Sequence, residues 1–562
     1  MLTFASRARR LAATMGAALA LLAAAPRGSS GQDASAAARG TTLCVTQGPR
    51  GGEWKRAFNP FRDDTDTRWP ATAGVYEPLL VYSRATRTYL PWLATAHQWG
   101  AGNLTLRFTI RPGVVWSDGA EFSGRDVVFT FDLMRRFPAL DRGGVWGFLA
   151  EVKSGDATTV EFTFSRPYTP GFLAVSTQPI VAEHKWKDVA QPAAFDDPIP
   201  VGTGPFVEVR RFEPGVYELG RNPKYWQKEK PAVAVLRVPL YRSNDEILRA
   251  LDESRVDWAS LFVDNIEKRW VSADPARHLY WYPDFGQTVL LHLNNRHKPF
   301  DDADVRKAVS QAIDRPRIMR EAMNGYAPAA DSTGLAESQS RWKDPALVQS
   351  GGWTGRDVAR ANTLLDAAGL ARGEGGIRSV PGGGPMRYDL NLVEGWSDWN
   401  AAAAIIRQNL AEVGVDVSVK PLTYDAWVGA LERGRFDMGI WFGERGPTPY
   451  EFYRGQMDTA LVKPVGEKAT ANFHRFGSPE ASRLLRRFEG SSDPAEQEKL
   501  GRDLQKIFVD SAPSLPLFAS PLWGVFNTTH ITGFPNRFNP YAGAAPGLQS
   551  DSLPVLVGVK PR

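Results

Sequence analysis

The hydrophobic residues between positions 386 and 450 change their spacing four times. They alternate with polar residues over 388–392, 415–419 and 438–442, which is the pattern of strands. Over 402–413 and 424–431 they recur every three or four residues, as on one face of a helix. Links this short between strands and helices predict parallel strands joined by right-handed crossovers. This part of the chain is therefore predicted to be an α/β unit.

The rest of the chain repeats the mixture of strands and helices. Alternating or continuous apolar runs predict strands at 41–47, 104–110, 160–164 and 288–293, and helical spacing predicts helices at 123–134 and 305–313. The chain has 562 residues, 43% of them hydrophobic and 23% charged. At roughly 150 residues per domain, this indicates two to four globular domains of the α/β class.

The first 31 residues are predicted to be a secretory signal peptide. Three arginines precede the apolar run 11–25, and small polar residues follow it. The run is shorter than the roughly 20 residues that a membrane span needs. Removing residues 1–31 removes four arginines and lowers the formal charge from +5 to about +1. No basic run remains to bind nucleic acid, so we expect an exported protein without a nucleic-acid partner.

The sequence offers little catalytic or metal-binding chemistry. Its one cysteine, Cys44, lies in the predicted first strand and excludes a disulfide framework. The seven histidines are scattered, and there is no zinc-protease, nucleophile-elbow or nucleotide-binding motif. Paired carboxylates for glycoside hydrolysis have only a spatial signature, so they stay open. We expect no cofactor and no metal.

Two loops follow predicted parallel strands and are the best candidates for a ligand site. Ligands of such sheets bind beyond the carboxyl ends of the strands, and both loops lie at that edge. Aromatic, carboxylate and amide side chains gathered there suit a small-molecule site. The candidate ligand-binding residues are Trp396, Asp398, Trp399, Asn400, Trp441, Glu444 and Tyr450.

Several of these residues also have a structural explanation. Trp427 lies on the apolar face of its helix and is assigned to the core, whereas Trp441 fits either the core or the site. Trp396 and Trp399 stand in a polar loop, which favours a role in binding. Asp398 is equally suited to capping the following helix.

Four blocks of the sequence are distinctive, at 116–131 (WSDGAEFSGRDVVFTF), 202–206 (GTGPF), 221–226 (RNPKYW) and 293–315. In their order and spacing they resemble one family, the extracytoplasmic solute-binding proteins (family 5) of ABC importers. The resemblance covers about 41–562. It implies a type II periplasmic-binding-protein fold, with two α/β lobes, a hinge and an extra inserted domain.

Applied to this sequence, the resemblance predicts the domain boundaries. Lobe I would comprise 41–75, 200–288 and 520–562, the extra domain 76–199, and lobe II 289–519. The chain would cross between the lobes near 285–293 and 515–526.

The resemblance also implies the function. Ligand would bind between the lobes, which close about the hinge, and the closed monomer would deliver it to a separate permease and ATPase complex. The expected role is binding in the periplasm, without catalysis. The tryptophan loops resemble the branch that binds cellobiose-like oligosaccharides, and the same family binds oligopeptides. A secreted glycoside hydrolase is the alternative from another class.

Overall fold

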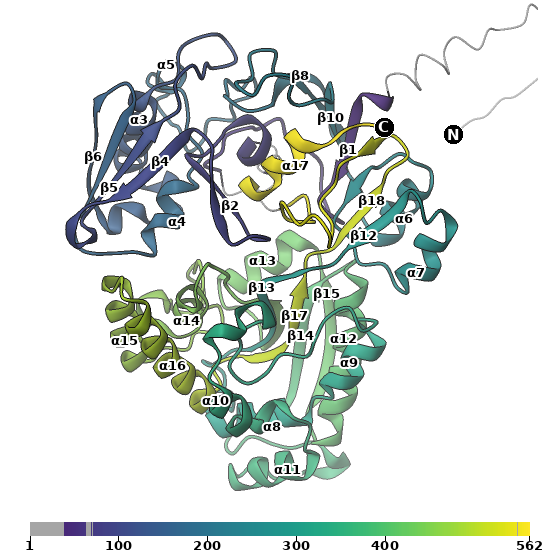
Figure 1. Ribbon diagram of the computed structural model, residues 1–562. Coiled ribbons are helices and arrows are strands. Elements are labelled where there is room, and N and C mark those ends of the chain that lie inside the picture. Colours follow the sequence, from purple (N-terminus) through teal and green to yellow (C-terminus); the bar gives the residue numbers. More distant parts are fainter. Residues whose placement is uncertain (1–38, 63–68, 70, 548) are drawn as a thin grey trace, which may run out of the picture.

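The computed structural model describes residues 39–62, 69, 71–547 and 549–562. The predicted signal peptide at 1–31 lies outside the described residues. Three sheets organise the described chain, one of seven strands, one of five and one of four. In Figure 1 the five-stranded sheet forms the lower body, and the other two sheets lie in the upper part.

The seven-stranded sheet contains the first strand of the chain. Its order is β12 (His278–Trp281), β18 (Gly524–Asn527), β11 (Trp258–Ala259), β1 (Thr42–Thr46), β10 (Val235–Pro239), β9 (Val216–Arg221) and β8 (Phe206–Glu213). β1 is parallel to both of its neighbours, whereas β8, β9 and β10 form an antiparallel meander. Helix α6 (Asn244–Asp252) begins at Ser243, whose hydroxyl accepts from the backbone N–H of Glu246.

The five-stranded sheet holds the α/β unit predicted from the spacing. Its order is β15 (Asp416–Leu422), β14 (Arg387–Val393), β16 (Met438–Phe442), β13 (Asp284–Leu293) and β17 (Leu515–Pro521). β14 is parallel to β15 and β16, as predicted, and helices α12 (Ser397–Glu412) and α13 (Tyr424–Glu432) make the crossovers. β13 and β17 are antiparallel to each other, and β13 is also antiparallel to β16.

A four-stranded antiparallel sheet with one long helix makes the third part. Its order is β4 (Ala94–Trp99), β5 (Thr105–Ile110), β7 (Thr159–Phe164) and β6 (Leu149–Asp156). Helix α3 (Gly124–Arg136) begins with a capping box between Ser123 and Asp126. The buried residues Val127 and Phe131 of α3 belong to the same apolar core as the inner face of this sheet.

Other helices surround the five-stranded sheet in the lower body. They are α8 (Ala303–Ala312), α9 (Arg315–Glu321), α10 (Pro345–Ser350), α11 (Val358–Ala367), α14 (Pro449–Met457), α15 (Pro479–Gly490) and α16 (Pro494–Ser511). Their buried side chains and those of the sheet make one apolar core, which runs from Val289 to Phe518. A separate, larger core fills the upper part.

The chain passes twice between the upper and lower bodies. One passage leads from β12 to β13 and the other from β17 to β18, and both are visible near the centre of Figure 1. Two such passages between bodies are the arrangement found at the hinges of proteins whose domains close around a ligand. The exact domain boundaries stay a prediction.

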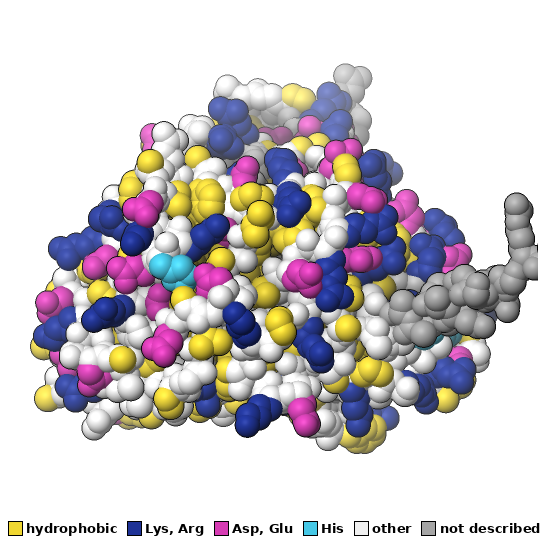
Figure 2. Space-filling model, turned by 90° about the horizontal axis from the view of Figure 1, so that it is seen from above, with side chains coloured by type: hydrophobic (Ala, Val, Ile, Leu, Met, Phe, Trp, Pro, Cys, Tyr) yellow, Lys and Arg dark blue, Asp and Glu magenta, His cyan; other side chains and the backbone are white. Residues whose placement is uncertain are grey.

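The described surface has no strongly charged face of one sign in the view of Figure 2, where basic and acidic side chains are interspersed. Among the described residues, no helix is both long enough and apolar enough for a membrane span.

Candidate ligand-binding site

A cavity of about 420 Å³ lies where the two predicted lobes meet. From lobe I it is lined by the loop that follows β1, at 47–50, by 260–262 and by the passage at 521–523. From lobe II it is lined by the loops that follow β14 and β16. Both of these loops leave the carboxyl ends of parallel strands, the edge at which open α/β sheets bind ligands.

Aromatic rings make much of the cavity wall. Trp396 and Trp399 meet edge to face with their centroids 4.7 Å apart, and Trp399 contacts Phe442 at 4.9 Å. Across from them, Trp523 meets Phe262 edge to face at 5.3 Å. Rings that hold one another in this way present rigid flat surfaces to a ligand, at little cost in conformational entropy.

The carboxyl group of Asp398 is the acidic group in the cavity lining. Asp398 lies in the first turn of α12 and is 5% exposed. Burial raises the pKa of Asp398 to about 7, and hydrogen bonds from backbone N–H groups at the start of the helix oppose this shift. The cap position itself belongs to Trp396, which makes no side-chain capping bond. Asp398 is therefore poised between the charged and neutral forms near neutral pH.

The remaining polar groups of the cavity come from both lobes. Gln47 has a buried side-chain nitrogen with no hydrogen-bond partner among the described residues. Asn244 donates to the Ser397 hydroxyl at 3.0 Å, so it also bridges the lobes. Arg445 donates to the Gln287 amide oxygen at 3.1 Å. A ligand with several hydroxyl or amide groups would find donors and acceptors on both sides.

Three of the seven predicted site residues line the cavity, namely Trp396, Asp398 and Trp399. Trp441 lies behind the wall, with its ring parallel to that of Trp396 at 6.3 Å. Asn400 donates to the carbonyl oxygen of Trp396 at 2.7 Å and so holds the loop against the helix. A part in binding for Trp441 and Asn400 stays a prediction.

Glu444 and Tyr450 make contacts inside the protein instead of lining the cavity. Glu444 accepts from the Gln456 amide at 3.0 Å, and burial raises the pKa of Glu444 to about 7. The Tyr450 hydroxyl donates to Glu489 at 2.6 Å and lies 3.2 Å from the Tyr168 hydroxyl. Neither residue is among those that line the cavity. Direct contact with ligand stays a prediction for both residues.

The sequence analysis missed the contribution of lobe I. Gln47, Phe262 and Trp523 line the cavity but lie far apart in the sequence. The available signal was position, because Gln47 ends the predicted strand 41–47 and Trp523 lies within the predicted crossing at 515–526. Trp427, assigned to the core, is fully buried there.

Cys44 and His292 are both buried within strands. Burial raises the pKa of Cys44 to about 12, which leaves a neutral thiol in β1. His292 is buried in β13, while the His297 ring lies 3.3 Å from Asp437. No group of three metal-binding side chains occurs in the described part of the chain.

Comparisons with known proteins agree with this geometry. The sequence profile of the bacterial extracellular solute-binding proteins, family 5 Middle, matches residues 88–460. Di/tripeptide-binding protein 2 of Pseudomonas aeruginosa is 25% identical over 547 residues, covering 89% of this chain and 92% of that protein. The nickel-binding periplasmic protein of Escherichia coli is 23% identical over 507 residues, covering 81% and 88%.

Solved structures share the whole fold. The mannohexaose-bound periplasmic oligopeptide-binding protein of Thermotoga maritima superposes with a TM-score of 0.85 at 23% identity, covering 93% of this chain and 99% of that one. The oligopeptide-binding protein of Bacillus subtilis in complex with a nonapeptide has a TM-score of 0.77 at 17% identity, covering 93% and 99%.

A ligand-sized cavity between two α/β bodies that the chain joins twice defines a binding protein of the two-lobed, type II periplasmic class. The chain belongs to the bacterial extracellular solute-binding proteins, family 5. It is therefore a solute-binding protein of the kind that serves ABC importers, as the sequence analysis predicted.

Proposed function

We propose that the protein captures a short oligosaccharide between its lobes and delivers it to a membrane permease. The observation that carries this proposal is the wall of the cavity, where tryptophans from both lobes stand beside uncharged amides and hydroxyls. Sugar rings have apolar C–H faces that pack on flat aromatic rings, and their hydroxyls both donate and accept hydrogen bonds. The Thermotoga maritima neighbour was solved with mannohexaose, so this fold can hold such a chain.

Titration with cello-oligosaccharides tests the proposal. Cellobiose and cellotriose should quench or enhance the tryptophan fluorescence of the purified protein and raise its melting temperature, because ligand that binds only the folded state stabilises it. Trp396→Ala removes a half-buried ring from the cavity wall. We expect it to weaken binding about tenfold, the effect of losing one stacking contact and its buried area.

Trp146→Ala is the matched control, because Trp146 is also half-buried but packs on Arg135 of α3, outside the cavity. It should bind sugar as the parent does. If Trp396→Ala binds sugar as tightly as the parent, the proposed stacking role of Trp396 is wrong. If no sugar produces a response, the proposal that the ligand is an oligosaccharide is wrong.

An oligopeptide is the second candidate. Asp398 and Arg445 place opposite charges in the lining of one cavity, as the two termini of a short peptide require. The relatives named di/tripeptide-binding proteins support the same reading. Titration with trialanine, N-acetylated trialanine and trialanine amide tests this candidate. If the cavity recognises the two termini of a peptide, blocking either terminus should lower the affinity.

The proposed role is transport without catalysis. The family consists of binding proteins, which supports this reading over a secreted glycoside hydrolase. Product analysis after long incubation with β-glucans should show no cleavage.

We further propose that the mature protein is a periplasmic monomer that works with a separate permease and ATPase. Loss of sugar-dependent growth on gene deletion would support import, and the mass of the purified mature chain would locate the cleavage near residue 31.

A further inference from the structure

A second cavity of about 50 Å³ adjoins the first. The two share Arg445 in their walls. One side of the second cavity belongs to the extra domain, at the hairpin of β2 (Leu80–Ser83) and β3 (Thr88–Pro91). The other side belongs to lobe II, at the 3₁₀ segment Glu337–Trp342 and at the loop after β16. The space holds about four water-sized spheres, which is enough for one small polar group and too little for another sugar ring.

The wall of this cavity is strongly basic. Arg84, Arg87, Arg341 and Arg445 line it, and the described lining residues include no carboxylate. Arg84 lies 3.6 Å from the buried carboxylate of Asp551, which offsets one charge.

The hydrogen bonds and ring contacts of the other three arginines involve no carboxylate, and the charge of the buried Asp551 also acts on Arg445. Arg87 donates to the carbonyl oxygen of Ser338, and Arg445 donates to the Gln287 amide oxygen. Arg341 lies over the ring of Trp342 at 4.9 Å. Like charges gathered in a half-enclosed space repel one another, so an anion placed among them is favoured.

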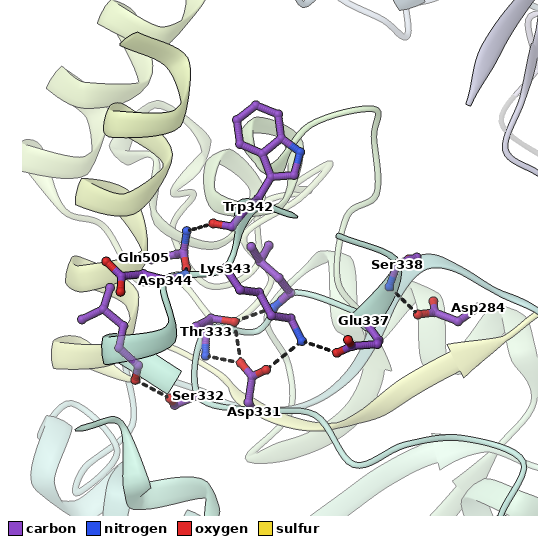
Figure 3. Close-up of polar contacts among 12 residues, drawn as sticks. Asp284, Asp331, Ser332, Thr333, Glu337, Ser338, Trp342, Lys343, Asp344 and Gln505 are labelled. Atoms are coloured by element: carbon purple, nitrogen blue, oxygen red, sulfur yellow. Dashed lines mark hydrogen bonds and ion pairs between the residues drawn. The ribbon is translucent and has the colours of Figure 1, made fainter. Parts of the chain in front are cut away.

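The segment that carries Arg341 is held in place by its own contacts, drawn in Figure 3. Lys343 donates to Asp331 at 2.8 Å and to Glu337 at 3.1 Å, so two carboxylates already balance this lysine. The backbone N–H of Ser338 donates to Asp284 at 3.0 Å, and Gln505 donates to the carbonyl oxygen of Trp342 at 2.6 Å. A fixed wall binds a ligand group with less loss of conformational freedom.

We propose that the second cavity binds the carboxylate of an acidic oligosaccharide whose neutral part occupies the main cavity. The inference rests on the proposed oligosaccharide function and names the ligand as a chain that carries a uronate. Guanidinium groups suit this partner because their parallel N–H donors match the two carboxylate oxygens. Since the arginines come from the extra domain and from lobe II, the bound carboxylate would bridge the two parts and favour the closed form.

The test compares two ligands that differ by one group. Cellobiouronic acid is cellobiose with one CH₂OH replaced by a carboxylate, and both are titrated calorimetrically into the mature protein. We expect the uronate to bind at least about tenfold more tightly, as for a hydrogen bond to a charged partner. Arg341→Gln should weaken uronate binding about tenfold and leave cellobiose binding within about twofold.

Arg407→Gln is the matched control, because Arg407 is exposed on α12 and lines neither cavity. It should change neither affinity. Both arginines are exposed, so melting temperatures should confirm that both variants fold.

The outcomes separate this inference from the proposed function. If cellobiose binds but the uronate gains nothing, or if Arg341→Gln weakens both equally, the inference is overturned and the sugar-binding proposal stands. If neither sugar binds and trialanine binds more tightly than its amide, the carboxylate belongs to a peptide and the acidic sugar is overturned. If neither sugar nor peptide binds, the proposed function fails with the inference.

Discussion

At the scale of single residues, the most consequential group in the main cavity is the carboxyl of Asp398. Its pKa of about 7 in the folded protein lies well above the ordinary value of 3.8. Below about pH 4 both the folded and the unfolded chain hold this proton, so the group has no effect on stability. As the pH rises towards 7, the unfolded chain releases the proton while the folded chain still holds it. The raised pKa of Asp398 therefore lowers the free energy of unfolding increasingly with pH.

Asp398→Asn should therefore stabilise the protein increasingly as the pH rises. Between pH 5 and pH 8 the free energy of unfolding of the variant, relative to the parent, should grow by an amount on the order of 3 kcal/mol. Urea unfolding at the two pH values measures it. The raised pKa values of Glu77, Glu444 and Glu451 act in both proteins and cancel in the difference.

Asp425→Asn replaces an exposed aspartate in the first turn of α13 and controls for the loss of a negative charge. A stability difference for Asp398→Asn that is the same at pH 5 and pH 8 would show that Asp398 titrates normally in the folded protein.

Sequence patterns predicted residues on the lobe II side of this cavity and none on the lobe I side. Trp396 and Trp399 were predicted because the sequence places both in a polar segment after a strand, without an apparent core role. Trp399 instead lies within α12, is 3% exposed and belongs to the apolar core of the lower body as well as to the cavity wall. Trp523 and Phe262 carry no such signal, because the fold brings them together from segments that neither spacing nor polarity connects. Asn400 is the reverse case. Its side-chain amide was predicted to bind ligand, and in the structure it donates to the backbone carbonyl oxygen of Trp396 in its own loop.

At the scale of elements, periodicity predicted the β14–β16 unit well. Its strands are parallel, because short helical crossovers allow no other direction. The spacing could not show how closely α13 approaches β16. The fully buried ring of Trp427 lies directly over Gly439, and its indole N–H donates to the carbonyl oxygen of Ile440 at 3.2 Å.

Two glycine substitutions in this unit should have opposite effects. A methyl group at Gly439 would lie 2.2 Å from the Trp427 ring, so Gly439→Ala should lower the free energy of unfolding by about 1–3 kcal/mol or more. At Gly429, within α13, the nearest atom would be an arginine nitrogen at 3.8 Å. Gly429→Ala should therefore raise stability by up to about 1 kcal/mol, because alanine favours the helix. Denaturant unfolding of both variants measures the signs, and a neutral Gly439→Ala would contradict this packing.

At the scale of the whole molecule, contacts between the predicted lobes and extra domain surround the cavity. Asn244 and Ser397 join the lobes at one side. At another, Arg166 of the extra domain lies 2.6 Å from Glu489 of α15, and the backbone N–H of Thr169 donates to the Glu489 carbonyl oxygen at 3.1 Å. The Arg166 and Thr169 contacts hold the parts together without touching the cavity, whereas Asn244 also lines it. All of them join parts that separate in the open form that the family resemblance implies. No sequence pattern predicted these contacts, because they join residues more than 150 positions apart.

Weakening one of these contacts should lower ligand affinity from a distance. Arg166→Ala removes an ion pair in which the arginine side chain is about half exposed and the Glu489 side chain is 9% exposed. If the closed form becomes less populated, the apparent dissociation constant rises in proportion, and we expect an increase of up to roughly threefold for an ion pair worth about 0.6 kcal/mol. Titration with the bound sugar measures the affinity, and small-angle scattering of the free protein should show a larger radius of gyration. Arg487→Ala breaks an exposed ion pair with Glu496 inside lobe II and should change neither quantity. Unchanged affinity and radius for Arg166→Ala would mean that the extra domain and lobe II stay together for reasons independent of this contact.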